Sequence, residues 1–280
     1  MTTKELELFA LDIRTQIVKA IAKKGGGHIG GSLTLADLLA VLYGNVMKYD
    51  PEKPDWDGRD YLISSKGHAG PALYAALALK GFFPMEWLDE LNIEGTRLPG
   101  HCDRLKVPGI DATTGSLGQG ASIAAGAAFG LKKQHRDGQY VYCITGDGES
   151  AEGQIWEAAA FAGHFHLNNL IFFLDWNKKQ IDGTNDEVMS LMNPMKKYEA
   201  FGWFAMKVSG KDVTEIENAI SYAKQNCGDK PIFIALDVVK GSGVPCIEEL
   251  ENNHCIGVPA ALAETALAQL ESHRRMIVEG

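Results

Sequence analysis

One aspartate, Asp147, stands between two glycines, and one asparagine, Asn177, follows thirty residues later. Each comes just after an apolar run, YVYCIT at 140–145 and LIFFLD at 170–175, and such runs are typical of buried strands. Carboxylate and amide oxygens are hard ligands, which suit Mg²⁺ or Ca²⁺ rather than a soft metal. If the two strands are neighbours in a parallel sheet, both side chains lie at the edge where ligands bind.

The residues around this aspartate suit an anion as well as a cation. Gly146 and Gly148 would let the backbone approach a bulky anion, and a helix predicted to begin near Ser150 would present its N-terminus to it. Two protein oxygens are too few to hold Mg²⁺, so a diphosphate that supplies further oxygens would complete the coordination shell.

Simpler interpretations of these stretches remain. The GDG sequence by itself is most often a tight turn, with Asn177 a turn residue. An EF-hand is excluded because Ala151 and Glu152 stand where that loop needs an oxygen ligand and a glycine. GSLGQG at 115–120 has the wrong order for a dinucleotide fingerprint and no strand before it, and a Walker lysine motif is absent.

The elements that must position these residues follow from apolar periodicity. Strands are predicted at 61–63, 140–145, 170–175, 203–208 and 231–239. Helices are predicted at 4–24, 34–47, 71–80, 84–91, from 121 onward, from about 150, and at 264–276. A further helix is predicted to begin at Asp212, which forms a capping box with Glu215.

Short strands that alternate with helices predict an α/β fold with a doubly wound, mainly parallel sheet and helices on both faces. The chain shows no internal repeat, low-complexity tract or linker, so residues 1–280 are interpreted as one domain. The Ala- and Gly-rich helix from 121 onward predicts very close packing, with another subunit as one candidate neighbour.

The composition limits the classes of binding partner and the cellular compartment that are expected for this protein. The formal net charge is −9 and no basic run exceeds two residues, which argues against nucleic acid and anionic membranes as partners. No secretion signal or apolar run long enough to span a membrane is visible. The five cysteines are scattered, which favours reduced thiols and a cytoplasmic location.

Taken together, several stretches resemble transketolase. GDG followed by DWNKKQIDG (175–183) is similar to the diphosphate-binding motif of thiamine diphosphate (ThDP) enzymes. Four further stretches carry the more specific likeness: GGGHIGGSL (25–33), SKGHAGPALYA (65–75), LPGHCD (98–103) and TTGSLGQG (113–120). The resemblance extends from about residue 10 to residue 258.

The resemblance implies ThDP and Mg²⁺ or Ca²⁺ as cofactors. In the family, the positions of Asp147, Asn177 and the main-chain carbonyl of Lys179 bind the cation. Ile181 would contact the thiazolium ring, and Gly115 and Leu117 the aminopyrimidine. The implied cofactor-binding set is His68, Gly115, Ser116, Leu117, Gly146, Asp147, Gly148, Glu149, Asn177, Ile181, Lys240 and His254.

The resemblance also assigns the sugar chemistry to His28, His68, His101 and His254. Ketol transfer requires protons to be taken and returned near neutral pH, which suits imidazole. His101 would bond a donor hydroxyl, His68 would lie near the diphosphate, and Lys240 would pair with His254. Glu152 has two interpretations: it complements a helix dipole, or it lies at a subunit interface near the partner's activating Glu.

The family's pyrimidine-binding domain, which carries that activating Glu, has no counterpart in the sequence. The chain is therefore interpreted as a natural subunit of a split transketolase, with an excised fragment as the alternative. The implied partner is a C-terminal subunit that carries this domain, in a heterotetramer of two chains of each kind. The implied substrates are a ketose donor and an aldose acceptor, by default pentose phosphates.

Three rival functions are left open. The α-subunit of a 2-oxoacid dehydrogenase also binds ThDP, but the histidines 28, 68 and 101 argue against it. A 1-deoxyxylulose-5-phosphate synthase has similar histidine loops in a longer chain. The third rival is a non-catalytic scaffold, in which Asp147 and Asn177 hold only a structural cation.

Overall fold

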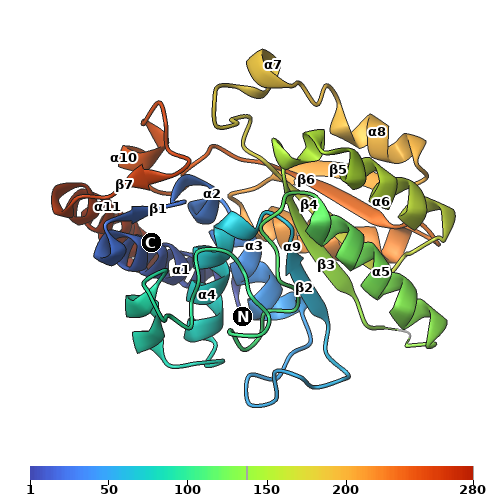
Figure 1. Ribbon diagram of the computed structural model, residues 1–280, viewed down its shortest axis with the longest axis horizontal. Helices are drawn as coiled ribbons and strands as arrows, with labels where there is room; N and C mark the ends of the chain where they lie inside the picture. The colour runs from blue at the N-terminus through green and yellow to red at the C-terminus, as the bar shows by residue number, and fades with distance from the viewer. Residues whose placement is uncertain (137, 280) are drawn as a thin grey trace.

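A five-stranded parallel sheet forms the centre of the computed structural model, which describes residues 1–136 and 138–279 (Figure 1). The strands lie in the order β2-β3-β4-β6-β5, and every neighbouring pair is parallel. Their bounds are Tyr61–Ser64 (β2), Val141–Gly146 (β3), Leu170–Trp176 (β4), Phe204–Ser209 (β5) and Ile232–Asp237 (β6). Each coincides with a predicted strand to within a few residues.

Both faces of the inner strands β3, β4 and β6 are buried, which explains why these strands are apolar along most of their length, whereas the edge strand β5 is only partly buried. In β3, Tyr142 and Ile144 pack into one core, whereas Val141 and Cys143 pack into the other. This alternation follows from the two-residue period of a strand.

Helices cover the two faces separately (Figure 1). One face carries α1 (Thr3–Lys24), α3 (Ala36–Val41), α4 (Gly70–Leu79) and α9 (Val213–Asn226), and α11 (Ala260–Glu279) packs on α1. The other face carries α5 (Gln119–Lys133), α6 (Gly153–His164) and α8 (Pro194–Ala200). The predicted doubly wound α/β fold is therefore confirmed.

Shorter elements connect this framework. They are β1 (Gly26–Gly27), α2 (Gly30–Leu33), the π-helix η1 (Leu42–Val46), η2 (Gly67–Ala69), η3 (Met85–Glu90), η4 (Glu149–Ala151), α7 (Asn185–Val188), α10 (Pro245–Glu248) and β7 (Ile256–Gly257). β1 pairs with β7 in a small antiparallel sheet, which joins the two ends of the chain.

Three predicted helices differ from the structure. The helix expected at 34–47 is divided into α3 and η1, and Thr34 precedes it without capping it, because its hydroxyl bonds Asp175. The helix expected at 84–91 is the 3₁₀ helix η3. The helix expected near Ser150 begins at Gly153, after the single 3₁₀ turn η4.

The capping box predicted at Asp212 is only half formed. The Asp212 carboxylate accepts hydrogen bonds from the N–H groups of Thr214 and Glu215, as an N-cap should. The Glu215 carboxylate accepts from the N–H of Ser209, at the end of β5. This contact joins α9 to the strand that precedes it.

Strand register brings the two sequence motifs together. Gly146, the last residue of β3, lies opposite Asp175 of β4, so Asp147 and Asn177 follow the same edge of the sheet. No helix in the described ranges is long and apolar enough to cross a membrane. The five cysteines are free, as predicted.

Candidate active site

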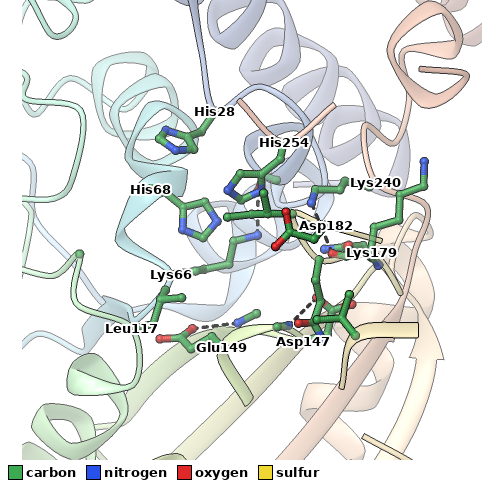
Figure 2. A pocket seen from close by; sticks show the side chains of 18 of the residues that line it. His28, Lys66, His68, Leu117, Asp147, Glu149, Lys179, Asp182, Lys240 and His254 are labelled. Carbon is green, nitrogen blue, oxygen red and sulfur yellow. Dashed lines mark hydrogen bonds between the residues drawn. The ribbon is translucent and has the colours of Figure 1, made fainter. Parts of the chain in front are cut away.

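A cavity of about 340 Å³ lies at the carboxyl edge of the sheet (Figure 2). This volume is in the range of small-molecule sites. The predicted site residues that line it are His28, His68, His101, Gly115, Leu117, Gly146, Asp147, Gly148, Glu149, Asn177, Lys179, Ile181, Lys240 and His254. They come from loops spread over more than two hundred residues of sequence, and the fold brings them to one place.

One wall of the cavity, here called the oxygen side, consists of the side chains of Asp147 and Asn177 and the main-chain carbonyl of Lys179. The two side chains are buried and follow β3 and β4. The Asn177 side-chain oxygen accepts from the N–H of Lys179 at 3.2 Å, which holds the tight turn between them.

Three donors orient the Asp147 carboxylate. One oxygen accepts from the N–H of Gly148 at 2.8 Å. The other accepts from the N–H of Lys178 at 2.5 Å and from the Asn185 amide at 3.0 Å. Within the described residues, the Asn185 carbonyl oxygen is buried and has no hydrogen-bond partner. Asn185 was not predicted as a site residue, because no spacing signal distinguishes it from an ordinary helix residue of α7.

The oxygen side fits a hard divalent cation. Burial, and next the charge of Asp175, raises the pKa of Asp147 to about 6, so a bound cation would relieve a buried negative charge. Across the described ranges, no three His, Cys, Asp or Glu side chains are placed to hold a metal by themselves. A cation here would therefore depend on amide and carbonyl oxygens and on oxygens of a ligand.

Lys240 brings a positive charge to this wall. Its ammonium donates to the Lys179 carbonyl at 3.3 Å, and that carbonyl can accept a second partner because it has two lone pairs. Burial, and next the charge of Lys66, lowers the pKa of Lys240 to about 8. Lys179 itself points its ammonium away, toward the carbonyls of Leu250 and Glu251.

The opposite wall, here called the histidine side, consists of the rings of His28, His68, His101 and His254. The centroid of His28 lies 5.4 Å from that of His68, 5.6 Å from that of His101 and 5.2 Å from that of His254. The His68 and His254 centroids are 5.0 Å apart. Three loops and the 3₁₀ helix η2, which contains His68, thus bring the four imidazoles into one compact cluster.

Two glycines allow these loops to approach so closely. A side chain on Gly30 would place its Cβ 2.2 Å from the carbonyl oxygen of Asn253, which joins the loops of His28 and His254. That carbonyl accepts from the N–H of Gly30 at 3.0 Å. A Cβ on Gly67 would lie 2.6 Å from the backbone of Thr114, which joins the loop of His68 to the loop after His101.

Three imidazoles on this side, those of His28, His68 and His254, are held neutral. Burial is the main cause that lowers the pKa of His68 to about 2 and that of His254 to about 3, and the nearby lysines Lys66 and Lys240 add to it. Burial also lowers the pKa of His28. At neutral pH these three rings act as hydrogen-bond donors and acceptors without a charge.

A buried ion pair connects the two walls. The Lys66 ammonium bonds the Asp175 carboxylate and, at 2.9 Å, the carbonyl of Gly31, and it lies between the two walls in Figure 2. Thr34 donates to the same Asp175 oxygen at 2.8 Å. Both charged side chains are about 98% buried or more. No role was predicted from the sequence for the lysine of SKGH or the aspartate of LIFFLD.

Two predicted site residues do not line the cavity. Ser116 is exposed, and its carbonyl accepts from the N–H of Gln119 at the start of α5. Glu152 is an exposed N-cap of α6 with no side-chain capping bond. The N-terminus of α6 does not line the cavity either, because the preceding turn η4 ends the lining at Glu149. The lining residues that were not predicted are Gly31, Lys66, Gln180, Asp182 and Val188.

Comparison with known proteins agrees with this architecture. Residues 7–274 match a family model described as transketolase, thiamine diphosphate binding domain. The 6-deoxy-6-sulfo-D-fructose transketolase subunit of Clostridium sp. (strain MSTE9) is 49% identical over 92% of this chain and 94% of that protein. An apulose-4-phosphate transketolase subunit of Phocaeicola vulgatus is 38% identical over 93% of this chain and 92% of that protein.

Solved structures of transketolases are also similar to this chain. The transketolase of Campylobacter jejuni superposes with a TM-score of 0.90 at 29% identity, covering 99% of this chain and 46% of that one. A Pichia stipitis transketolase variant superposes with a TM-score of 0.84 at 27% identity, covering 45% of its chain. This chain thus spans less than half the length of the solved chains, whereas it spans nearly all of the two subunits.

Proposed function

Because this chain belongs to the transketolase family and matches its thiamine diphosphate binding domain, we propose that it is the N-terminal subunit of a two-chain transketolase. In this proposal residues 1–280 form one domain, which holds the diphosphate half of the cofactor. The enzyme transfers a two-carbon ketol unit from a ketose to an aldose. The convergence of the oxygen side and the histidine side on one cavity carries the proposal.

The chemistry divides between the two walls. When bound, thiamine diphosphate supplies the carbanion that accepts and releases the two-carbon unit. The oxygen side, Asp147, Asn177 and the Lys179 carbonyl, would hold Mg²⁺ or Ca²⁺ against the diphosphate, and the Lys240 ammonium would add positive charge. On the histidine side, the neutral rings of His28, His68 and His254 would orient the sugar hydroxyls, and His101 would take and return the proton of the donor hydroxyl.

We infer that the donor is a ketose with an anionic group at its far end. The two relatives carry the names of a sulfo-sugar and a sugar phosphate, and the sulfonate is the first candidate because that relative is 49% identical. Both anions would find a complementary charge on the partner chain, because Lys240 is assigned to the diphosphate. Pentose phosphates, the default expectation, remain the alternative donors.

We infer a partner chain that carries the pyrimidine-binding domain and the activating Glu, in a heterotetramer. Two relatives of nearly this length carry the word subunit in their names. Ile123 on α5 and Phe161 on α6 are 42% and 37% exposed, so this face offers apolar surface to a partner. Glu152, exposed at the start of α6, is the proposed contact near the partner's Glu.

The proposal is tested in two stages. Calorimetric titration of the chain with ThDP should show much tighter binding with Mg²⁺ than with EDTA, whereas a scaffold with a structural cation site would show no such dependence. The chain is then mixed with a companion subunit, and two-carbon transfer is assayed with sulfo-fructose, fructose 6-phosphate and xylulose 5-phosphate. Activity of the chain alone, or turnover of pyruvate instead of a ketose, would contradict the proposal.

A further inference from the structure

The Glu149 carboxylate is buried at the floor of the cavity, with a residue exposure of 3%. One oxygen accepts from the hydroxyl of Ser65 at 2.5 Å and from the N–H of Gly118 at 2.7 Å. The other oxygen accepts from the N–H of Gly146 at 2.9 Å. The resemblance assigns Glu149 to the cofactor, but protein donors already engage both of its oxygens.

The three donors belong to three different segments of the chain. Ser65 directly follows β2, and Gly118 precedes α5 in the loop whose residues Gly115 and Leu117 line the cavity. Gly146 ends β3 and immediately precedes Asp147 of the oxygen side. A single carboxylate therefore connects the turn that holds Asp147 to the loop on the neighbouring wall.

The three hydrogen bonds to Glu149 are stronger than ordinary hydrogen bonds between neutral loop groups. Hydrogen bonds to an ionised acceptor are shorter and stronger than those between neutral groups, and they gain further strength where water is excluded. Ser65 is also fixed from the other side, since its oxygen accepts from the N–H of Ala121 in the first turn of α5 at 3.2 Å. The contact thus sets the position of the start of α5 relative to the end of β3.

We propose that Glu149 is a positioning residue that fixes the distance between the 146–148 turn and the 115–118 loop, so that a ligand touching both fits without rearrangement. This inference rests on the proposed function, because it takes ThDP to be the ligand that spans the two loops. If Glu149 merely supported the 146–148 turn, its substitution would weaken the binding of every ligand of that turn by the same factor.

Two ligands separate these cases. ThDP reaches both loops, whereas inorganic pyrophosphate reaches only the turn and the oxygen side. The variants are Glu149→Gln, which keeps the shape but places an amide NH₂ against protein donors, and Ser65→Ala, which removes one of the three bonds. Glu264→Gln, an exposed acid on α11, is the matched control.

Affinities of the 280-residue chain for both ligands are measured by calorimetry with Mg²⁺, together with the melting temperature. For Glu149→Gln we expect ThDP to bind at least ~10-fold more weakly, because a charged hydrogen-bond network is broken. Pyrophosphate affinity should change less than about threefold, since that ligand needs only one loop. Ser65→Ala should weaken ThDP binding by a few-fold with the same selectivity, and the control should change neither affinity.

Equal weakening of both ligands, or unchanged ThDP affinity in Glu149→Gln, would overturn the inference. If Glu149→Gln does not fold, Ser65→Ala provides the test. A ratio of ThDP affinity to pyrophosphate affinity equal to that of the wild type would then overturn the inference. A wild-type chain that binds pyrophosphate but not ThDP would overturn the proposed function itself. The two failures are therefore distinguishable.

Discussion

The oxygen side and the histidine side of the cavity are built in different ways. The oxygen side follows two adjacent strands, so the register of β3 and β4 sets where Asp147 and Asn177 lie. The histidine side comes from three loops and η2, and close backbone approaches at Gly30 and Gly67 set where its rings lie. Local strand geometry therefore determines one wall, and long-range packing determines the other.

Burial has opposite effects on the pKa values of the two walls, because it disfavours whichever form is charged. It raises the pKa of Asp147 to about 6 and lowers that of His68 to about 2. At neutral pH the oxygen side keeps a negative charge for a cation, while His68 has none. This difference favours the binding of cations on the oxygen side and hydrogen bonds to uncharged groups on the histidine side.

The comparison predicts the largest effect on binding for Asp147→Ala. Removing the only carboxylate of the oxygen side should abolish the dependence of ThDP affinity on Mg²⁺, since two neutral oxygens hold the cation poorly. Calorimetric titration with Mg²⁺ and with EDTA measures this. Wild-type affinity in the variant would remove Asp147 from the ligand set.

The matching substitution on the histidine side is His101→Ala, which should separate turnover from binding. We expect turnover to fall by about 10²- to 10⁴-fold, typical of the loss of an acid–base group, while ThDP affinity stays near that of the wild type. Steady-state assays of the assembled enzyme and calorimetry of the variant chain measure the two quantities. A near-normal rate would exclude His101 from the proton transfer.

The different construction of the walls explains how much of the site could be predicted. Asp147 and Asn177 directly follow apolar strands, so the sequence alone brings them to one edge, and the doubly wound sheet follows from the same runs. The histidines give no such signal, because nothing local says that loops more than two hundred residues apart meet. Only the resemblance to a family grouped His28 with His254.

The burial of three charged residues in and around the site could not be predicted, for a different reason. Lys66, Asp175 and Glu149 have the residue types of an exposed loop, a strand end and a helix start, and sequence does not say that their charges are buried. Ser116, predicted to bind the cofactor, is exposed in the turn before α5 and does not line the cavity. Side-chain direction within a loop depends on tertiary contacts that no periodicity records.

A third prediction concerns Lys66, which joins the two walls. Lys66→Met leaves the Asp175 carboxylate buried without its partner, which should lower the free energy of unfolding by about 3–5 kcal/mol. Lys23→Met is the control, because the side chains of its ion pair with Asp89 are 57% and 58% exposed. That change should cost less than about 1 kcal/mol. Equal losses in urea denaturation would show that the pair does not join the walls energetically.

The smallest predicted effect is a pH dependence that distinguishes the walls. The pKa of His68 is lowered to about 2 in the folded chain. Below about pH 6.5 this histidine is therefore protonated in the unfolded chain but not in the folded chain, so its contribution makes the folded chain less stable in acid. Asp147 has the opposite effect on stability between about pH 6 and pH 3.8. Because its pKa is raised, the folded chain binds more protons there than the unfolded chain, so acid raises stability through this residue.

The variant His68→Asn isolates the first contribution. Between pH 7.5 and pH 5.5 the wild type should lose about 1.4 kcal/mol more unfolding free energy than the variant, because the histidine of the unfolded chain takes up its proton around pH 6.5, within this interval. Urea denaturation at both values measures the difference, and the Asp147 contribution cancels because both chains retain that residue. An equal loss in the two chains would mean that His68 is protonated in the folded state, and the histidine side would then carry charge like the oxygen side.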